Sequence, residues 1–133
     1  MEYYTMKTKF KSILKKNKTH LSITISIDGN KIKHNLQRVY PDGRGSYDDV
    51  IKNIPLWLSQ FPNGETKATF ASEDLPYLKD SIIHLWERGI KRVPANIVFE
   101  DVWKNGDTKI FESQLIELAD YIIENKIFLD PQY

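Results

Sequence analysis

An alternation of apolar and polar residues marks the first extended element of the chain. From residue 21 the order is Leu-Ser-Ile-Thr-Ile-Ser-Ile-Asp. In a strand this order puts the apolar side chains on one face and the polar side chains on the other. Further stretches rich in apolar residues, at 66–71 and 92–100, are typical of two more strands. The pattern therefore predicts strands at 21–28, 66–71 and 92–100.

Apolar residues at helical spacing fill the stretches after each of these strands. Their period predicts helices at about 47–61, 73–88 and 108–126, and Pro55 should kink the first of them. A serine stands before each of the first two helices and acidic residues follow it, so we expect Ser46 and Ser72 to act as N-caps.

The first 20 residues carry six lysines and a single glutamate. Phe10, Ile13 and Leu14 have the i, i+3, i+4 spacing of one helix face, so this stretch predicts an amphipathic N-terminal helix. Its lysines fit either a solvated face or contact with an anionic partner.

Strands that are separated by long helices cannot form hairpins, so we expect a parallel sheet with right-handed crossovers. The predicted fold is α/β: a partial (β/α) barrel segment of about three parallel strands with crossover helices, after an N-terminal helix. Residues 1–133 would form a single domain, with the lysine-rich helix in 1–20 and three βα units in 21–133. A complete barrel needs about 200 residues or more, which this chain does not have.

The composition argues against several classes of function. The 133 residues have a net charge of +1, which argues against a nucleic-acid partner. The chain has no cysteine, so its own side chains cannot form a disulfide, a thiol nucleophile or an iron–sulfur site. No apolar run approaches the ~20 residues that span a bilayer, so we expect no membrane partner and a cytoplasmic protein.

Polar residues near the ends of two predicted strands are candidate site residues. In parallel α/β proteins, sites gather at the carboxyl ends of strands, and the polar face of the first predicted strand places Ser26 and Asp28 at that end. The alternative for Asp28 is that it starts a turn with Gly29. Asn96 and Glu100 on the third strand are candidates for substrate binding. Glu100, with Asp101, could hold a substrate cation or act as an acid or base, and the alternative is two carboxylates in an exposed loop.

Short motifs in the middle of the chain resemble a known family. They are Ser26-Ile-Asp-Gly29, His34-Asn-Leu-Gln-Arg38 and Pro41-Asp-Gly-Arg-Gly-Ser-Tyr47, followed later by Leu85-Trp-Glu-Arg-Gly-Ile90 and Phe99-Glu-Asp-Val-Trp103. In combination they look like the central stretch of radical SAM peptide and protein maturases. Within that family they resemble the enzymes that modify cysteine-repeat peptides and the anaerobic sulfatase maturases. The resemblance runs from about Leu21 to the C-terminus.

The resemblance implies a partial (β/α)6 barrel that binds S-adenosylmethionine (SAM) and a [4Fe–4S] cluster. It would place Ser26 and Asp28 at the cofactor and give Arg38 the role of pairing with the cofactor carboxylate. Asn35 departs from the aspartate usual in the family. The cysteine motif CxxxCxxC is absent, so we expect an internal fragment that has no catalytic residues and holds no cofactor by itself.

Three hypotheses for function follow. The chain could contribute a SAM- or peptide-binding surface to a complementing radical SAM fragment. It could instead be a non-catalytic interaction module that retains the barrel remnant. It could also bind a small molecule through Ser26, Asp28, Arg38 and Glu100. Since a short open sheet exposes strand edges and apolar surface, we also expect a homo-oligomer.

Overall fold

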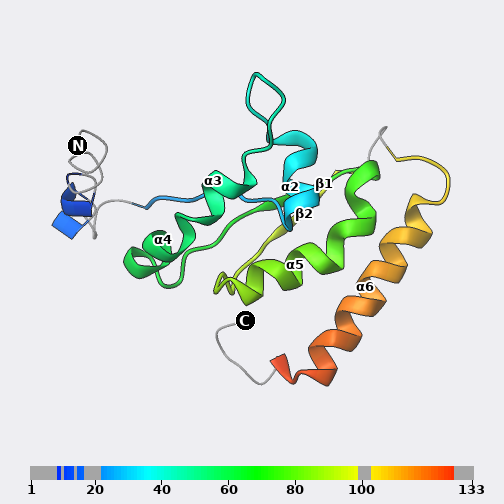
Figure 1. Ribbon diagram of the computed structural model, residues 1–133. Coiled ribbons are helices and arrows are strands. Elements are labelled where there is room, and N and C mark those ends of the chain that lie inside the picture. Colours follow the sequence, from blue (N-terminus) through cyan, green and yellow to red (C-terminus); the bar gives the residue numbers. More distant parts are fainter. Residues whose placement is uncertain (1–8, 10, 14, 17–21, 99–102, 128–133) are drawn as a thin grey trace.

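The computed structural model describes residues 9, 11–13, 15–16, 22–98 and 103–127. Figure 1 shows the elements, which follow in the order α2 (Lys31–Gln37), α3 (Tyr47–Ile51), α4 (Ile54–Gln60), β1 (Ala68–Phe70), the 3-10 helix η1 (Ser72–Tyr77), α5 (Leu78–Glu87), β2 (Ala95–Ile97) and α6 (Asp107–Glu124). Residues 9, 11–13 and 15–16 are helical, and the rest of the predicted N-terminal helix lies outside the described residues. None of the described helices is long and apolar enough to cross a membrane.

Strands β1 and β2 form a parallel pair in which Ala68 faces Ala95 and Phe70 faces Ile97. Helices η1 and α5 make the crossover that a parallel pair requires. A parallel bridge between Glu65 and Arg92 continues the pairing before the two strands begin. Two of the three predicted strands therefore form, and each is shorter than predicted.

The prediction of a first strand at 21–28 is wrong. Residues 22–28 are extended, and the burial alternates as predicted, but within the described chain they belong to no sheet. The Thr66 hydroxyl takes the place of a ladder partner: it accepts a hydrogen bond from the Ile27 amide at 3.4 Å and donates to the Ile25 carbonyl at 2.8 Å. A side chain therefore holds this segment beside the start of β1 where backbone pairing was expected.

The predicted fold class is wrong for the same reason. A partial (β/α) barrel segment needs three adjacent parallel strands, and the described part of the chain has a two-stranded sheet surrounded by helices. A period of two along a sequence reports which side chains share a face, but it does not report whether a second backbone lies at hydrogen-bonding distance.

The predicted helix at 47–61 forms as two shorter helices, α3 and α4. Pro55 lies in the first turn of α4, where its missing N–H costs nothing, so it begins a new helix. Ser46 occupies the predicted N-cap position of α3, but its side chain makes no capping hydrogen bond, and Ser72 is the first residue of η1 rather than its cap. The later helices agree with the pattern, with η1 and α5 covering 72–87 and α6 covering 107–124.

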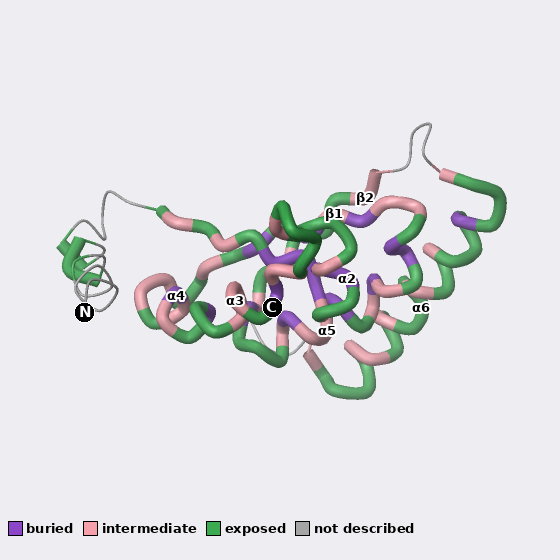
Figure 2. Tube along the Cα trace, turned by 45° about the horizontal axis from the view of Figure 1, so that its top comes forward, coloured by how far each residue is buried: buried purple, intermediate pink, exposed green. Residues whose placement is uncertain are grey.

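Two apolar clusters form the core. The first packs the extended segment against α3, α4 and α5, and its buried members are Ile27, Tyr47, Ile54, Trp57, Leu85 and Ile90. The second packs β1 against η1 and α5, and its buried members are Ala68, Phe70, Leu75, Leu78 and Ile82. Figure 2 shows the buried residues gathered in the middle of the molecule, whereas α6 lies at one side and is mostly exposed or half-buried.

Candidate functional site

Asp28 and Arg38, both predicted to bind a cofactor, form an ion pair with each other. Arg38 Nε donates to Asp28 Oδ2 at 2.6 Å, and Nη2 lies 3.5 Å from Oδ1. The Asp28 side chain is buried, while that of Arg38 is partly exposed. The edge of the guanidinium that would hold a ligand carboxylate in two hydrogen bonds therefore already holds Asp28.

His34 lies fully buried next to this pair, and its hydrogen bonds define its tautomer. The Asp28 amide donates to Nδ1 at 3.2 Å, so the ring proton is on Nε2. Nε2 in turn donates to Ser46 Oγ at 2.9 Å, and the Ser46 hydroxyl donates to the Arg38 carbonyl at 2.8 Å. Burial lowers the pKa of His34, which favours the neutral ring that this network requires.

Ser46, His34 and Asp28 are the residue types of a hydrolase triad, but their geometry is that of a structural network. A general base needs a lone pair on the nitrogen that faces the hydroxyl, and Nε2 of His34 carries the proton. The Asp28 carboxylate binds Arg38 instead of the imidazole. The cluster joins the loop before α3 to the extended segment and activates no nucleophile.

The hydrophobic pattern did not predict α2, on which this network depends. The Asn30 side chain accepts a hydrogen bond from the Lys33 amide at 2.9 Å and so caps the helix. This cap puts His34 in the second turn, from where it reaches back to Asp28. Asn30 after a glycine was the signal in the sequence that could have revealed α2.

A second histidine lies in the same part of the core. The Tyr47 hydroxyl and His84 Nε2 share a short hydrogen bond, and the Tyr47 ring meets the His34 ring edge to face at 5.9 Å between centroids. Burial lowers the pKa of His84 and raises the pKa of Tyr47, so both side chains are neutral near pH 7. His34 and Tyr47 are buried and His84 is half-buried, so these groups pack the interior.

The most buried charges of the described residues belong to Lys33 and Asp74, which the sequence did not single out. Lys33 Nζ lies 3.1 Å from Asp74 Oδ2, and each side chain is 1% exposed. The same ammonium lies 4.9 Å from the centroid of the Phe70 ring. Asp74 Oδ1 has no hydrogen-bond partner among the described residues. The pair connects α2 to η1 across the end of β1.

The remaining predicted site residues do not join Asp28 and Arg38. Ser26 is exposed, and Asn96 is exposed on β2. Within the described part of the chain, no hydrogen bond or ion pair links either of them to the ion pair. Glu100 lies outside the described residues. The structure also places no three His, Asp or Glu side chains of that part where they would hold a metal ion together.

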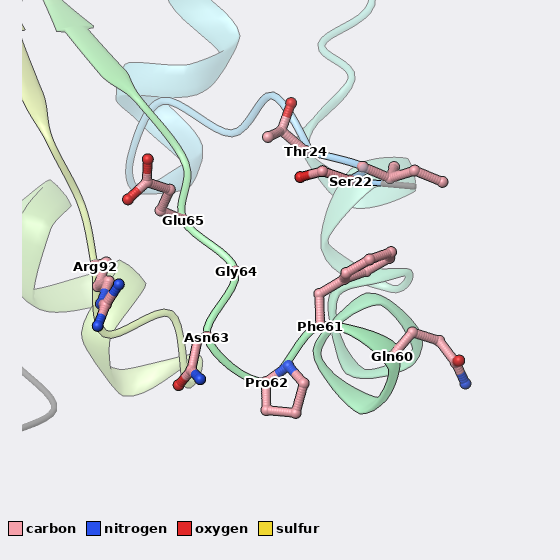
Figure 3. Close-up of a pocket in the computed structure, with 10 residues that line it drawn as sticks. Ser22, Thr24, Gln60, Phe61, Pro62, Asn63, Gly64, Glu65 and Arg92 are labelled. Atoms are coloured by element: carbon pink, nitrogen blue, oxygen red, sulfur yellow. The ribbon is translucent and has the colours of Figure 1, made fainter. Parts of the chain in front are cut away.

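An open hollow of about 540 Å³ lies at the other end of the extended segment, away from the predicted site. Figure 3 shows Ser22, Thr24 and Phe61 on one side of it and Asn63, Gly64 and Glu65 on the other. Its full lining is Ser22, Ile23, Thr24, Gln60, Phe61, Pro62, Asn63, Gly64, Glu65 and Arg92. No local sequence pattern indicates this hollow, because its residues come from three separate stretches.

The lining of the hollow offers both hydrogen-bond donors and hydrogen-bond acceptors, and its charged groups nearly cancel. Hydroxyls come from Ser22 and Thr24, side-chain amides come from residues 60 and 63, and one carboxylate and one guanidinium come from Glu65 and Arg92. Neither charged side chain forms an ion pair with another described residue. The Phe61 ring adds apolar surface. Such a lining can bind a polar, uncharged chain and has no excess of charge for a polyanion.

The backbone beside the hollow also has free hydrogen-bonding groups. In the described part of the chain, no backbone–backbone hydrogen bond joins residues 22–26 to another segment. The Trp57 indole N–H donates to the Ile23 carbonyl at 2.6 Å and so attaches the segment to α4. A Cβ at Gly64 would lie 2.6 Å from the Trp57 ring, so the turn on the other side packs directly on the same indole.

A scan against protein-family models and a search of curated proteins found no match to this chain. The resemblance to radical SAM maturases therefore rests on the short motifs alone.

Proposed function

We propose that this chain is a non-catalytic binding module that holds an extended peptide in the hollow between residues 22–24 and 60–65. The observation that carries the proposal is the extended backbone of residues 22–26, which reaches the hollow through residues 22–24 and makes no backbone–backbone hydrogen bond to another segment in the described part of the chain. Unpaired extended backbone is the surface to which peptides add as a further strand.

The character of the hollow supports a peptide over other ligands. A peptide backbone presents donors and acceptors in alternation, and the hydroxyls and amides around the hollow match both. A nucleotide or nucleic acid would require an excess of basic groups, whereas Arg92 and Glu65 balance each other. A peptide is also the class of substrate that the resemblance to peptide maturases implies, so a chain that supplies peptide-binding surface to a larger enzyme fits the same proposal.

The predicted cofactor site supports SAM binding less well. Arg38 would have to give up its contacts with Asp28 to hold the carboxylate of SAM, and this would leave a buried aspartate without its cation. The ion pair and the His34 network are sufficient to explain why Asp28, Arg38 and Ser46 occur together.

A displayed library of random linear peptides, selected on the immobilised chain, tests the proposal. We expect enriched peptides whose binding is lost in Ser22→Trp, because the indole would fill the hollow. Ser113→Trp is the matched control: Ser113 is an exposed serine on α6 and does not line the hollow. Peptides that bind both variants equally, or an absence of enrichment over an unrelated protein, would refute the proposal.

The position of the bound peptide can be measured directly. In amide NMR spectra of the chain, the selected peptide should shift the signals of residues 22–24 and 60–65, which line the hollow, and leave those of α6 unchanged. Shifts confined to Asp28, His34 and Arg38 would instead locate the ligand at the predicted cofactor site.

A further inference from the structure

Helix α6 presents a second apolar face that the rest of the described chain does not cover. Its inner face, with Phe111 and Leu118, packs on the second core cluster. Leu115, Ile116, Ala119 and Ile123 are exposed, and their i, i+3 and i+4 spacings place them in one stripe. Exposed apolar residues that form one contiguous stripe mark an interaction surface more often than scattered ones do.

The charges beside this stripe are strongly of one sign. Helix α6 carries five acidic residues and a single lysine. Glu117, Asp120 and Glu124 follow one another at i+3 and i+4 spacings next to the stripe, and all three are exposed. A partner that covers the apolar residues should therefore bring basic side chains to these carboxylates.

This charge pattern disfavours the packing of α6 on a second α6 and favours a basic partner. Antiparallel packing of two copies of α6 would bring their acidic rows together, and parallel packing would leave both rows without basic partners. The first 20 residues of the chain have the complementary composition, with six lysines around Phe10, Ile13 and Leu14. The described residues of that stretch, at 9, 11–13 and 15–16, are helical and exposed.

The arrangement of the molecule points to docking between copies. In both Figure 1 and Figure 2 the described helical residues 9, 11–13 and 15–16 lie at one end of the molecule and α6 lies at the other, with the core between them. Two copies can each place their lysine-rich stretch on the α6 of the other. This reciprocal exchange uses both contacts and closes after two copies.

We propose that the apolar and acidic face of α6 binds the lysine-rich N-terminal helix of a second copy of this chain. The apolar residues of the two helices would form the centre of the contact, with lysine–carboxylate pairs at its rim. The interface is distinct from the peptide-binding hollow, and neither proposal depends on the other.

Sedimentation velocity or light scattering on the whole chain tests this contact. We expect a dimer that dissociates when salt is raised, because the rim is ionic. Ile123→Glu should give a monomer. Ile32→Glu is the matched control, since Ile32 on α2 is 60% exposed and Ile123 is 64% exposed, and the control should remain dimeric.

A charge exchange separates the proposed contact from other modes of association. Lys11→Glu with Lys15→Glu should weaken the dimer at least tenfold, and so should Asp120→Lys with Glu124→Lys. The two pairs combined should restore the dimer, because the rim charges are opposite again. Circular dichroism of each variant confirms that it is folded. A monomer at every concentration, or a dimer that these substitutions leave unchanged, would overturn the proposal.

Discussion

The buried ion pair between Lys33 and Asp74 gives the sharpest prediction for stability. Lys33→Met removes the cation and keeps an apolar chain of similar length in the same space. The Asp74 carboxylate would then be left in the core with one weak contact, the Ala71 amide at 3.4 Å. Lys33 also lies over the Phe70 ring, so the substitution removes that contact as well.

The expected cost follows from the burial. Both side chains are 1% exposed, and removing one partner of such a pair typically destabilises a protein by about 3–5 kcal/mol. Replacing both residues, as Lys33→Met with Asp74→Leu, removes the unpaired charge and should return the stability to within about 1–2 kcal/mol of the original chain. The two single substitutions are therefore strongly non-additive.

Urea unfolding followed by circular dichroism measures this cycle. With a slope of about 2 kcal/mol per molar urea, a single substitution should lower the midpoint by roughly 1.5–2.5 M. Asp74→Asn, which keeps the shape of the side chain, provides a milder perturbation if Lys33→Met does not fold. Lys31→Met is the control, because Lys31 and Asp48 pair at 3.0 Å with both side chains largely exposed. A loss of less than about 1 kcal/mol at Lys33 would refute the reasoning.

Three further predictions concern the dependence of stability on pH, the effect of glycine substitutions and the binding of SAM. Burial lowers the folded-state pKa of His34 and of His84 below 6.5, so the unfolded chain takes up more protons as the pH falls through 6.5. The free energy of unfolding, measured by urea titration, should then decrease by at most about 1.4 kcal/mol per pH unit for each histidine, and a flat profile would contradict this. Gly29→Ala should lower the melting temperature more than Gly43→Ala: both glycines have positive φ, but only the first would put a Cβ 2.3 Å from a buried hydroxyl. Calorimetric titration with SAM should give no binding heat, and heat that Arg38→Ala abolishes would contradict the ion-paired role of Arg38.

The sequence predicted the parts of the fold that depend on local patterns. The stripes of α5 and α6, the break at Pro55 and the parallel pairing of β1 with β2 could all be inferred from spacing and order. The missing first strand could not, because its pairing was decided by the Thr66 hydroxyl, 39 to 41 residues away in sequence. Helix α2 has only seven residues and a mixed composition, so its period was too short to detect.

The candidate site was harder to predict than the fold. Asp28 and Arg38 were recognised as chemically notable, yet a sequence does not show that two opposite charges satisfy each other. Lysine is normally a surface residue, and Lys33 can be buried because Asp74 on η1 forms an ion pair with it. The hollow depends on three distant stretches and on where the chain leaves space, which no local pattern encodes.

The contacts that hold the extended segment determine which of its backbone amides exchange with solvent and from which end the segment opens. Its contacts come from single side chains on different elements, namely Trp57, Thr66 and His34. The amides of Ile27 and Asp28 have acceptors and should exchange slowly with deuterium, whereas those of residues 22–26 have none in the described chain and should exchange fast. The segment can therefore open from residue 22 toward residue 26 while β1 and β2 stay paired. A protease that cleaves there would release the lysine-rich residues and leave the core folded.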